Sequence, residues 1–162
     1  LTGHLVLSTL HTNDAPGAIT RLIDMGIEPF LVASSLIVIL AQRLVRAICP
    51  HCKESYTPPP HEIKFLETSL KSENIPKLLY RGHGCSKCMG KGYLGRTGIF
   101  ELLEITPDIR SMIIERKDTQ TIKTSAINAG FKTIMVHGIS KIINGITTTE
   151  EVLRVIQKDS EI

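Results

Sequence analysis

The sequence predicts a chain of three unlike parts: an α/β edge, a cysteine-bearing module with little regular structure, and a helical bundle. Three observations favour this fold class. Helical periodicity follows a short apolar run, all four cysteines and five of the eight prolines lie within residues 49–98, and four helix patterns fill residues 99–162. The net charge also changes at these boundaries: it is 0 over residues 1–48, +4 over residues 49–98 and −1 over residues 99–162.

Composition limits the class of protein. The 162 residues are 42% hydrophobic, which is enough to bury a core and excludes a mainly disordered chain. The net charge of +3 is too small to indicate nucleic acid by itself. No apolar run reaches the roughly 18 residues of a membrane span. The chain opens at Leu1 in an apolar run without a charged leader, so we expect the C-terminal part of a larger protein.

Residues 1–48 are expected to form strand, helix, helix and strand. Residues 5–10 are a nearly continuous apolar run, typical of a strand covered on both faces. Thr12 or Asn13 is expected to cap the helix that follows, and Gly26 to end it. A second, largely apolar helix is expected from Glu28 to about residue 41, and residues 43–48 suit a strand. These elements form one edge of an α/β domain and are too few for a domain alone.

The middle segment is less periodic. The three prolines at 58–60 predict a stiff, extended connector. A short helix is expected over residues 61–70 and strands over residues 77–80 and 97–105. Six glycines crowd the second cysteine pair and indicate tight turns there.

The last segment carries helix signals. Thr106, Pro107 and Asp108 form a helix start with a cap, a proline in the first turn and an acid near the positive end. Further helices are expected over residues 120–129 and 134–144. A fourth is expected to open at the capping box of residues 148–151.

The strongest chemical signal is a pair of C-x-x-C motifs, Cys49 with Cys52 and Cys85 with Cys88, with 32 residues between the two pairs. Each such turn delivers two thiolates to one ion, and zinc prefers four ligands of this kind in a tetrahedron. The separation is longer than in compact zinc ribbons, so an excursion is inserted between the pairs. The local charge of +4 offsets four thiolates and favours their deprotonation. We therefore predict structural Zn²⁺.

Other interpretations of these cysteines are weaker. A redox C-x-x-C usually opens a helix, whereas the residues after Cys52 favour none. Two disulfides need an oxidising compartment, and a buried set of thiols without a ligand does not account for the spacing. His51, His61 and His83 lie nearby as substitute ligands, but four cysteines already complete a zinc shell.

Two other groups are candidate sites on spacing alone. His4 and His11 bracket the first apolar run, and His11 falls where open α/β sheets place ligands; a surface histidine in a polar turn is the alternative. Arg43 and Arg46 lie on one predicted strand with two residues between them, and they either share an anionic partner or are solvated or ion-paired. The glycines of residues 92–98 resemble a phosphate loop, but they lack its Lys and precede a strand.

Residues 1–15, L-T-G-H-L-V-L-S-T-L-H-T-N-D-A, resemble the histidine box of the secretion ATPase superfamily, the motors of type II secretion and type IV pilus assembly. The resemblance continues through both cysteine pairs and covers nearly the whole chain. It is strongest to the type II secretion ATPase and then to the tetracysteine pilus assembly ATPases. The further matching segments are residues 20–22, 24–30, 41–46, 92–103 and 145–155.

This resemblance implies a homo-hexameric, RecA-like motor that hydrolyses ATP with Mg²⁺. Such motors are cytoplasmic, lie peripherally at the inner membrane without spanning it, and work with inner-membrane secretion or pilus platform proteins. Residues 1–48 would be the end of the RecA-like P-loop ATPase core, 49–98 the tetracysteine zinc module and 99–162 the α-helical C-terminal bundle. The family's histidine box matches His4 and His11, which would sense the γ-phosphate region of the nucleotide, and its metal module matches the four cysteines.

The chain also departs from the family pattern. It contains no phosphate loop, aspartate box or Walker B segment, so no residue of this chain is assigned to bind ATP, and the chain alone is expected to be inactive. Two alternatives remain open: a zinc-ribbon module that binds nucleic acid, and a zinc-stabilised structural module for protein interactions. We expect no nucleic-acid partner, because the aromatic residues of the basic segment are too scattered for base stacking.

Overall fold

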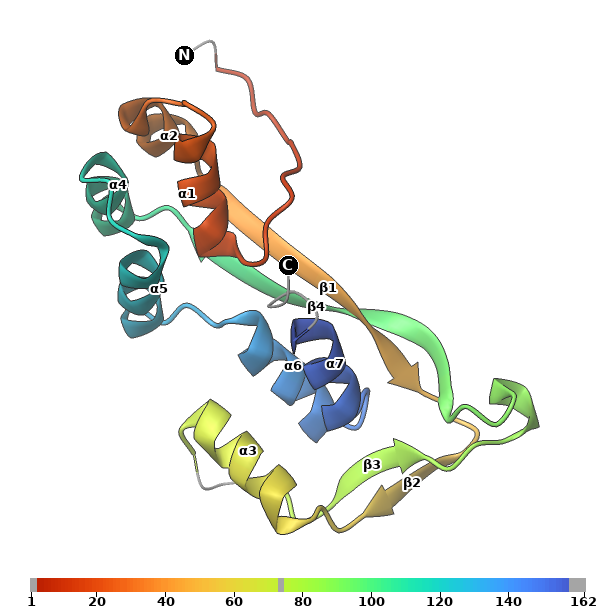
Figure 1. Cartoon of the computed structure of the whole chain (residues 1–162). Helices are drawn as coiled ribbons and strands as arrows, with labels where there is room; N and C mark the ends of the chain where they lie inside the picture. The colour runs from red at the N-terminus through yellow and green to blue at the C-terminus, as the bar shows by residue number, and fades with distance from the viewer. Residues whose placement is uncertain (1–2, 73–74, 158–162) are drawn as a thin grey trace. The chain divides into compact units, whose positions relative to one another are not determined.

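The computed structural model describes residues 3–72 and 75–157 (Figure 1). These residues form seven α-helices, four strands and one short 3-10 helix. By their contacts they divide into two units, which we describe one at a time. The first unit comprises residues 1–39 and 103–129, and the second comprises residues 40–102 and 130–162. The predicted mixed α/β class is confirmed.

Four helices form the first unit. α1 (Ala15–Asp24) packs against α2 (Pro29–Ser35) and α5 (Thr119–Asn128), and α4 (Pro107–Ile114) packs against α2 and α5. Apolar residues spaced three and four apart give each helix an inward stripe. The buried side chains that form this small core are Ala15, Ala18, Ile19, Val32, Ala33, Ile109, Ile113, Ile122 and Ala126.

The cap of α1 differs from the prediction. Asp14, and not Thr12 or Asn13, is the N-cap, and its Oδ1 accepts a hydrogen bond of 2.9 Å from the Gly17 backbone N–H. Asp14 is the residue directly before the first helical turn, and a cap side chain reaches the N–H two or three positions further on. Its other oxygen pairs with Lys123 Nζ of α5 at 2.8 Å. One carboxylate therefore starts α1 and ties it to α5.

The C-terminal end of α2 is closed by a side chain from α4. The Arg110 guanidinium donates to the Ala33 carbonyl and, at 3.2 Å, to the Leu36 carbonyl. The last carbonyl groups of a helix lack partners within the helix and carry partial negative charge. Arg110 satisfies both of these requirements for α2.

The segment before α1 is extended but belongs to neither of the two-stranded sheets. Leu5, Val6 and Leu7 are 74%, 78% and 89% exposed, so the predicted strand covered on both faces is wrong for this structure. A strand needs neighbouring backbones to accept and donate its hydrogen bonds and apolar layers to bury its side chains. Neither sheet that the described residues form supplies them here.

The second predicted helix is shorter than expected. α2 ends at Ser35, and β1 (Val38–Ile48) begins three residues later, where a helix to about residue 41 and a strand from residue 43 were predicted. The run Ile37-Val38-Ile39 is β-branched, which lowers helix propensity and suits a pleated strand. An apolar run of this kind does not separate the two states by periodicity.

The second unit contains two two-stranded sheets, one of β1 with β4 (Tyr93–Glu104) and one of β2 (Lys53–Tyr56) with β3 (Leu79–Gly82). The β2–β3 pair is antiparallel, with Lys53 opposite Gly82 and Tyr56 opposite Leu79. β2 was not predicted, β3 lies two residues later than the expected 77–80, and β4 begins earlier than the expected 97. Both β1 and β4 also have residues in the first unit.

The core of this unit is formed by α3 (Pro60–Leu70), α6 (Ile134–Ile143), α7 (Thr149–Gln157) and the strands. Its buried residues are Val45, Leu66, Leu79, Ile99, Ile134, Ile139, Ile142 and Val152. The helix predicted over 61–70 is confirmed, and the helices predicted over 120–129 and 134–144 begin and end within one residue of their expected positions. The fourth predicted helix begins at Thr149, within the expected capping box.

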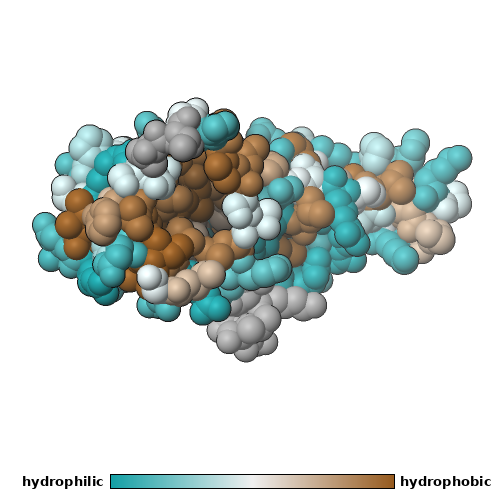
Figure 2. Space-filling model, turned by 90° about the horizontal axis from the view of Figure 1, so that it is seen from above, coloured by the Kyte–Doolittle hydropathy of each residue, from teal (hydrophilic) through white to brown (hydrophobic). Residues whose placement is uncertain are grey.

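Exposed apolar side chains are frequent in the first unit. Met25, Phe30 and Leu31, at the end of α1 and the start of α2, are 59%, 59% and 47% exposed. Figure 2 looks from above onto the end of the molecule where α2 lies and shows hydrophobic residues gathered on that face. Among the residues that the structure describes, no helix is both long and apolar enough to cross a bilayer.

Candidate metal centre

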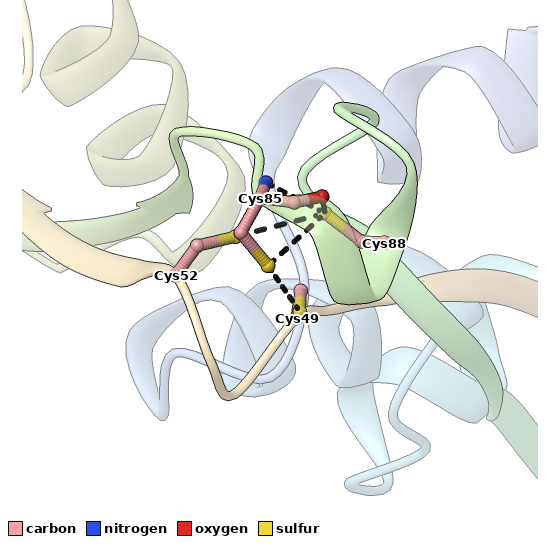
Figure 3. Close-up of side chains that lie close together, drawn as sticks. All are labelled: Cys49, Cys52, Cys85 and Cys88. Carbon is pink, nitrogen blue, oxygen red and sulfur yellow. Dashed lines mark hydrogen bonds between the residues drawn. The ribbon is translucent and has the colours of Figure 1, made fainter.

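The two C-x-x-C motifs meet in the second unit. Cys49 and Cys52 lie in the turn between β1 and β2, and Cys85 and Cys88 lie in the turn after β3, where η1 (Ser86–Cys88) forms. Figure 3 shows the four side chains gathered around one point. Their sulfur atoms all lie within 4.8 Å of one another, and all but Cys85 are buried.

The sulfur–sulfur distances fit a four-thiolate zinc site. The Sγ atoms of Cys49 and Cys85 are 3.9 Å apart, and Cys88 Sγ is 3.8 Å from Cys52 Sγ and 3.8 Å from Cys85 Sγ. A tetrahedron with Zn–S bonds of about 2.3 Å has edges of about 3.8 Å. Disulfides are excluded in this arrangement, because a disulfide joins its sulfurs at about 2.05 Å. The donor set therefore matches structural Zn²⁺ in number, chemistry and spacing.

Glycines shape the turn around Cys88. Gly92 adopts φ +74°, and its backbone N–H donates to Cys88 Sγ at 3.3 Å, as does the Cys85 N–H at 3.2 Å. A Cβ on Gly92 would lie 2.3 Å from the Gly82 carbonyl oxygen, and one on Gly82 would lie 2.0 Å from the Gly92 oxygen. Two backbones thus cross where only glycine fits. The tight turn that the glycines predict is confirmed at Gly92, and it directs this backbone N–H toward Cys88 Sγ.

The thiols of the cluster differ in acidity. Burial favours the neutral form of both Cys52 and Cys88, and it raises the pKa of Cys52 to about 12. At Cys88 the N–H groups of Cys85 and Gly92 outweigh burial and lower the pKa to about 6. Hydrogen bonds to the charged form stabilise a thiolate. The backbone around Cys88 therefore favours the thiolate form of this thiol.

The three nearby histidines stay outside the cluster. His51, His61 and His83 are exposed, and none belongs to the set of clustered ligand atoms found among the described residues. The His83 backbone N–H donates to the Cys52 carbonyl at 3.1 Å, so this residue contributes its main chain to the module.

The two histidines of the segment that resembles the histidine box lie in the first unit. His4 and His11 are both exposed and belong to the extended segment before α1. The cysteines belong to the second unit, so the chain carries its two groups of candidate residues on different units. The role predicted for His4 and His11 remains a prediction.

A buried carboxylate near the metal centre was missed at the level of sequence. Glu151 of α7 is fully buried and accepts from Arg46 Nη2 at 2.5 Å and from Arg154 Nε at 2.7 Å. The Arg46 guanidinium also lies 4.2 Å from the centroid of the Tyr93 ring. The alternative of an ion-paired arginine is therefore the correct one for Arg46. One sequence signal could have indicated this burial: Glu151 ends the predicted capping box and is followed directly by apolar residues.

A cleft of about 700 Å³ lies beside the module, lined among others by Tyr56, Tyr93, Glu62 and Glu150. It brings together aromatic rings that are scattered in sequence. The Tyr56 and Tyr93 rings, however, already have the chain's own arginines over them, 5.3 and 4.2 Å from their centroids. The two carboxylates of the lining are balanced by Arg81 and Lys91, so the cleft offers no excess of positive charge to phosphates. The cleft does not favour the nucleic-acid alternative.

Residues 1–154 match the protein family described as type II/IV secretion system protein. The chain is 49% identical to the type II secretion system ATPase E of Vibrio cholerae over 158 residues, which cover 98% of this chain and 31% of that protein. It is also 49% identical over 153 residues to the type IV pilus assembly ATPase PilB of Thermus thermophilus, covering 94% of this chain and 17% of that protein.

A third relative is the type II secretion system protein E of Pseudomonas aeruginosa, 49% identical over 159 residues, which are 98% of this chain and 31% of that protein. The chain thus spans about a third, or less, of the length of these curated relatives. The similarity extends through both cysteine pairs and the helical tail.

Proposed function

Because the chain belongs to the type II/IV secretion system protein family, we propose that it is the C-terminal part of a cytoplasmic ATPase that powers type II secretion or type IV pilus assembly. The observation that carries this proposal is the family match over residues 1–154. Two relatives that are 49% identical to the chain are named ATPases of these two systems. The proposed motor is a homo-hexamer that lies at the inner membrane and works on its secretion or pilus platform proteins.

Within this motor, residues 49–98 form a zinc module with Cys49, Cys52, Cys85 and Cys88 as ligands. The sulfur spacing of 3.8–3.9 Å supports zinc as the metal. Zinc would supply no redox chemistry and would cross-link the four thiolates. The chain's own contribution is the crossing of Gly82 and Gly92 and the N–H groups that face Cys88.

Residues 1–48 form the end of the RecA-like core, and His11 together with His4 contacts the γ-phosphate region directly or through water. Exposure of both rings supports this role, because a nucleotide can reach them. An imidazole donor placed at developing phosphate charge lowers the barrier for phosphoryl transfer. Residues 99–162 form the helical C-terminal domain.

The chain by itself is proposed to hydrolyse no ATP. It lacks the sequence G-x-x-x-x-G-K-[ST], whose Lys and hydroxyl supply most of the charge stabilisation for phosphoryl transfer. Phosphate release by the 162-residue chain should equal that of buffer, whereas the longer protein that contains it should turn over ATP. Turnover by the isolated chain would contradict the proposal.

The histidine assignment is tested in the longer protein. His11→Ala should lower kcat about a hundredfold, the range found when one transition-state donor is removed. Its unfolding midpoint should not change, because the His11 side chain is exposed. His61→Ala, an exposed histidine of the other unit, is the matched control and should keep full turnover. Unchanged turnover in His11→Ala would rule out the role.

A further inference from the structure

The turn between α6 and α7 is held by residues that flank the metal ligands. The Ile48 backbone N–H, directly before Cys49, donates to the Ile146 carbonyl at 2.9 Å. Two positions earlier, the Arg46 carbonyl accepts from Thr147 Oγ1 at 2.8 Å. Residues 144–148 are therefore hydrogen-bonded to the end of β1 that leads into the metal centre.

The other strands of the module, β2 and β3, also contact this turn. Gly145 lies so close to the β2–β3 pair that an added Cβ would be 2.5 Å from Tyr80 Cδ2 and 2.6 Å from Lys53 Nζ. Lys53 directly follows Cys52 and lies 4.2 Å from the centroid of the Tyr80 ring. Three consecutive positions of the turn thus contact chain that immediately flanks the first cysteine pair.

A third connection starts at Gly92, which the metal centre holds on both sides. Its carbonyl accepts from the Cys49 N–H at 2.9 Å, and its N–H donates to Cys88 Sγ at 3.3 Å. The next residue is Tyr93, whose hydroxyl lies 2.7 Å from Thr148 Oγ1. Thr148 in turn accepts from the Glu151 N–H at 3.3 Å in the first turn of α7. Every link of this path is a direct contact.

We propose that metal binding at the four cysteines is coupled to the ordering of residues 144–148 and of the first turn of α7. This inference rests on the proposed metal site. Without a metal, no bond joins the two cysteine turns at their sulfur atoms, so these turns lose their common anchor. The flanking residues then hold the turn less firmly, and α7 loses the contacts that fix its start.

The coupling must be reciprocal. If metal binding makes a contact of the turn more stable by a certain factor, then removing that contact must lower the affinity for the metal by that factor. Tyr93→Phe removes one hydroxyl at the turn and leaves the ligands and the aromatic ring in place. Tyr56→Phe is its matched control, because that hydroxyl donates to Glu62 at 2.8 Å, away from the turn.

The test is amide hydrogen exchange of the 162-residue chain with Zn²⁺ bound and after chelation. Zinc should slow exchange at residues 146–156 by about tenfold or more, which corresponds to opening made less favourable by about 1.4 kcal/mol. Amides of α1 serve as the reference within the same chain and should not change. In Tyr93→Phe this protection should shrink and the zinc dissociation constant should rise, whereas Tyr56→Phe should behave as the parent chain.

Cobalt binding separates the two proposals. Co²⁺ in a four-thiolate site gives intense charge-transfer absorption, which reports the ligand set independently of exchange. If these bands appear but exchange at residues 146–156 is the same with and without metal, the coupling is wrong and the metal site stands. If no metal binds, both are wrong, while the family assignment is unaffected. Equal zinc affinity in Tyr93→Phe and the parent chain would also overturn the coupling.

Discussion

At the scale of single residues, Glu151 shows how a buried charge is retained. Burial alone would raise its pKa, but hydrogen bonds from Arg154 and Arg46 hold the pKa well below its ordinary range. The carboxylate also accepts the Arg46 backbone N–H at 3.0 Å, so it joins β1 to α7 through both main chain and side chain. A buried acid with all its acceptor positions used is stabilised, whereas one with a partner removed is not.

Replacing this carboxylate should destabilise the second unit. Glu151→Gln removes the charge while keeping the shape, and we expect a loss of about 2 kcal/mol, the range for hydrogen bonds to charged groups. The loss stays moderate because the two guanidinium groups are 40% and 41% exposed and can be solvated. Urea unfolding measures it. Glu150→Gln, on the exposed side of the same turn, should change stability by less than about 0.5 kcal/mol; equal effects would contradict the assignment.

The same group predicts a pH dependence. Since the folded pKa of Glu151 is depressed, its contribution is fully present above the ordinary pKa of 4.5 and is lost as the pH falls toward the folded value. The stability difference between the parent chain and Glu151→Gln should therefore be constant near neutral pH and narrow below about pH 4.5. Unfolding curves at several pH values check this. A difference that widens in acid would be the wrong sign.

Sequence reasoning identified the clustered cysteines better than the residues that support them. The four cysteines are recognisable because each pair has the C-x-x-C spacing that is typical of metal ligands. Asp14 and Thr12 are both residue types that cap helices. The cap is the residue directly before the first helical residue, so the choice depends on the backbone becoming helical at Ala15. One of the two arginine partners of Glu151 is Arg46, 105 positions away, and no local pattern indicates such a pair.

At the scale of elements, local signals were sufficient for most helices and insufficient for strands. α4 begins where Thr106 accepts from the Ile109 N–H, and α6 begins where Thr133 accepts from the Val136 N–H, so these caps lie within the helix's own sequence. β2 has four residues, and its hydrogen bonds come from β3. Its existence depends on partner residues 23 to 29 positions away in sequence, which periodicity does not show.

The glycine crossing gives a sharp test at this scale. Gly92→Ala should destabilise the metal module by about 3 kcal/mol or more, because it adds a clash with Gly82 to the cost of a positive φ. Gly95→Ala is the matched control, since Gly95 has φ +77° and open space around its added Cβ. It should cost only about 1 kcal/mol. Denaturation together with zinc content measures both; equal losses would show that the crossing is unimportant.

At the scale of the whole molecule, each unit is assembled from segments far apart in sequence. The first unit joins residues 1–39 to 103–129, and the second joins residues 40–102 to 130–162. The predicted segments 1–48, 49–98 and 99–162 follow composition and the family's modules, and they remain a prediction about function. Composition changes along the chain, whereas packing joins helices such as α1 and α5 across about a hundred residues.

Burial across the molecule predicts which apolar residues support the fold. Ile19 is fully buried in the first unit, so Ile19→Ala should cost about 3 kcal/mol through lost contacts and a cavity. Leu7 is 89% exposed, and Leu7→Ala should change stability by less than about 0.5 kcal/mol. Thermal or urea unfolding of the chain distinguishes the two. A large loss in Leu7→Ala would show that residues 5–10 are packed after all.

The long interval between the cysteine pairs has a consequence for chain entropy. A metal at the four sulfurs closes a ring that contains β2, α3 and β3, because these elements lie between Cys52 and Cys85. Closing a ring of this size removes about 4 kcal/mol of conformational freedom from the unfolded chain. That quantity grows only with the logarithm of ring length, so doubling the ring would change it by about 0.6 kcal/mol. A longer or shorter segment within the ring would therefore change this entropic contribution to stability very little.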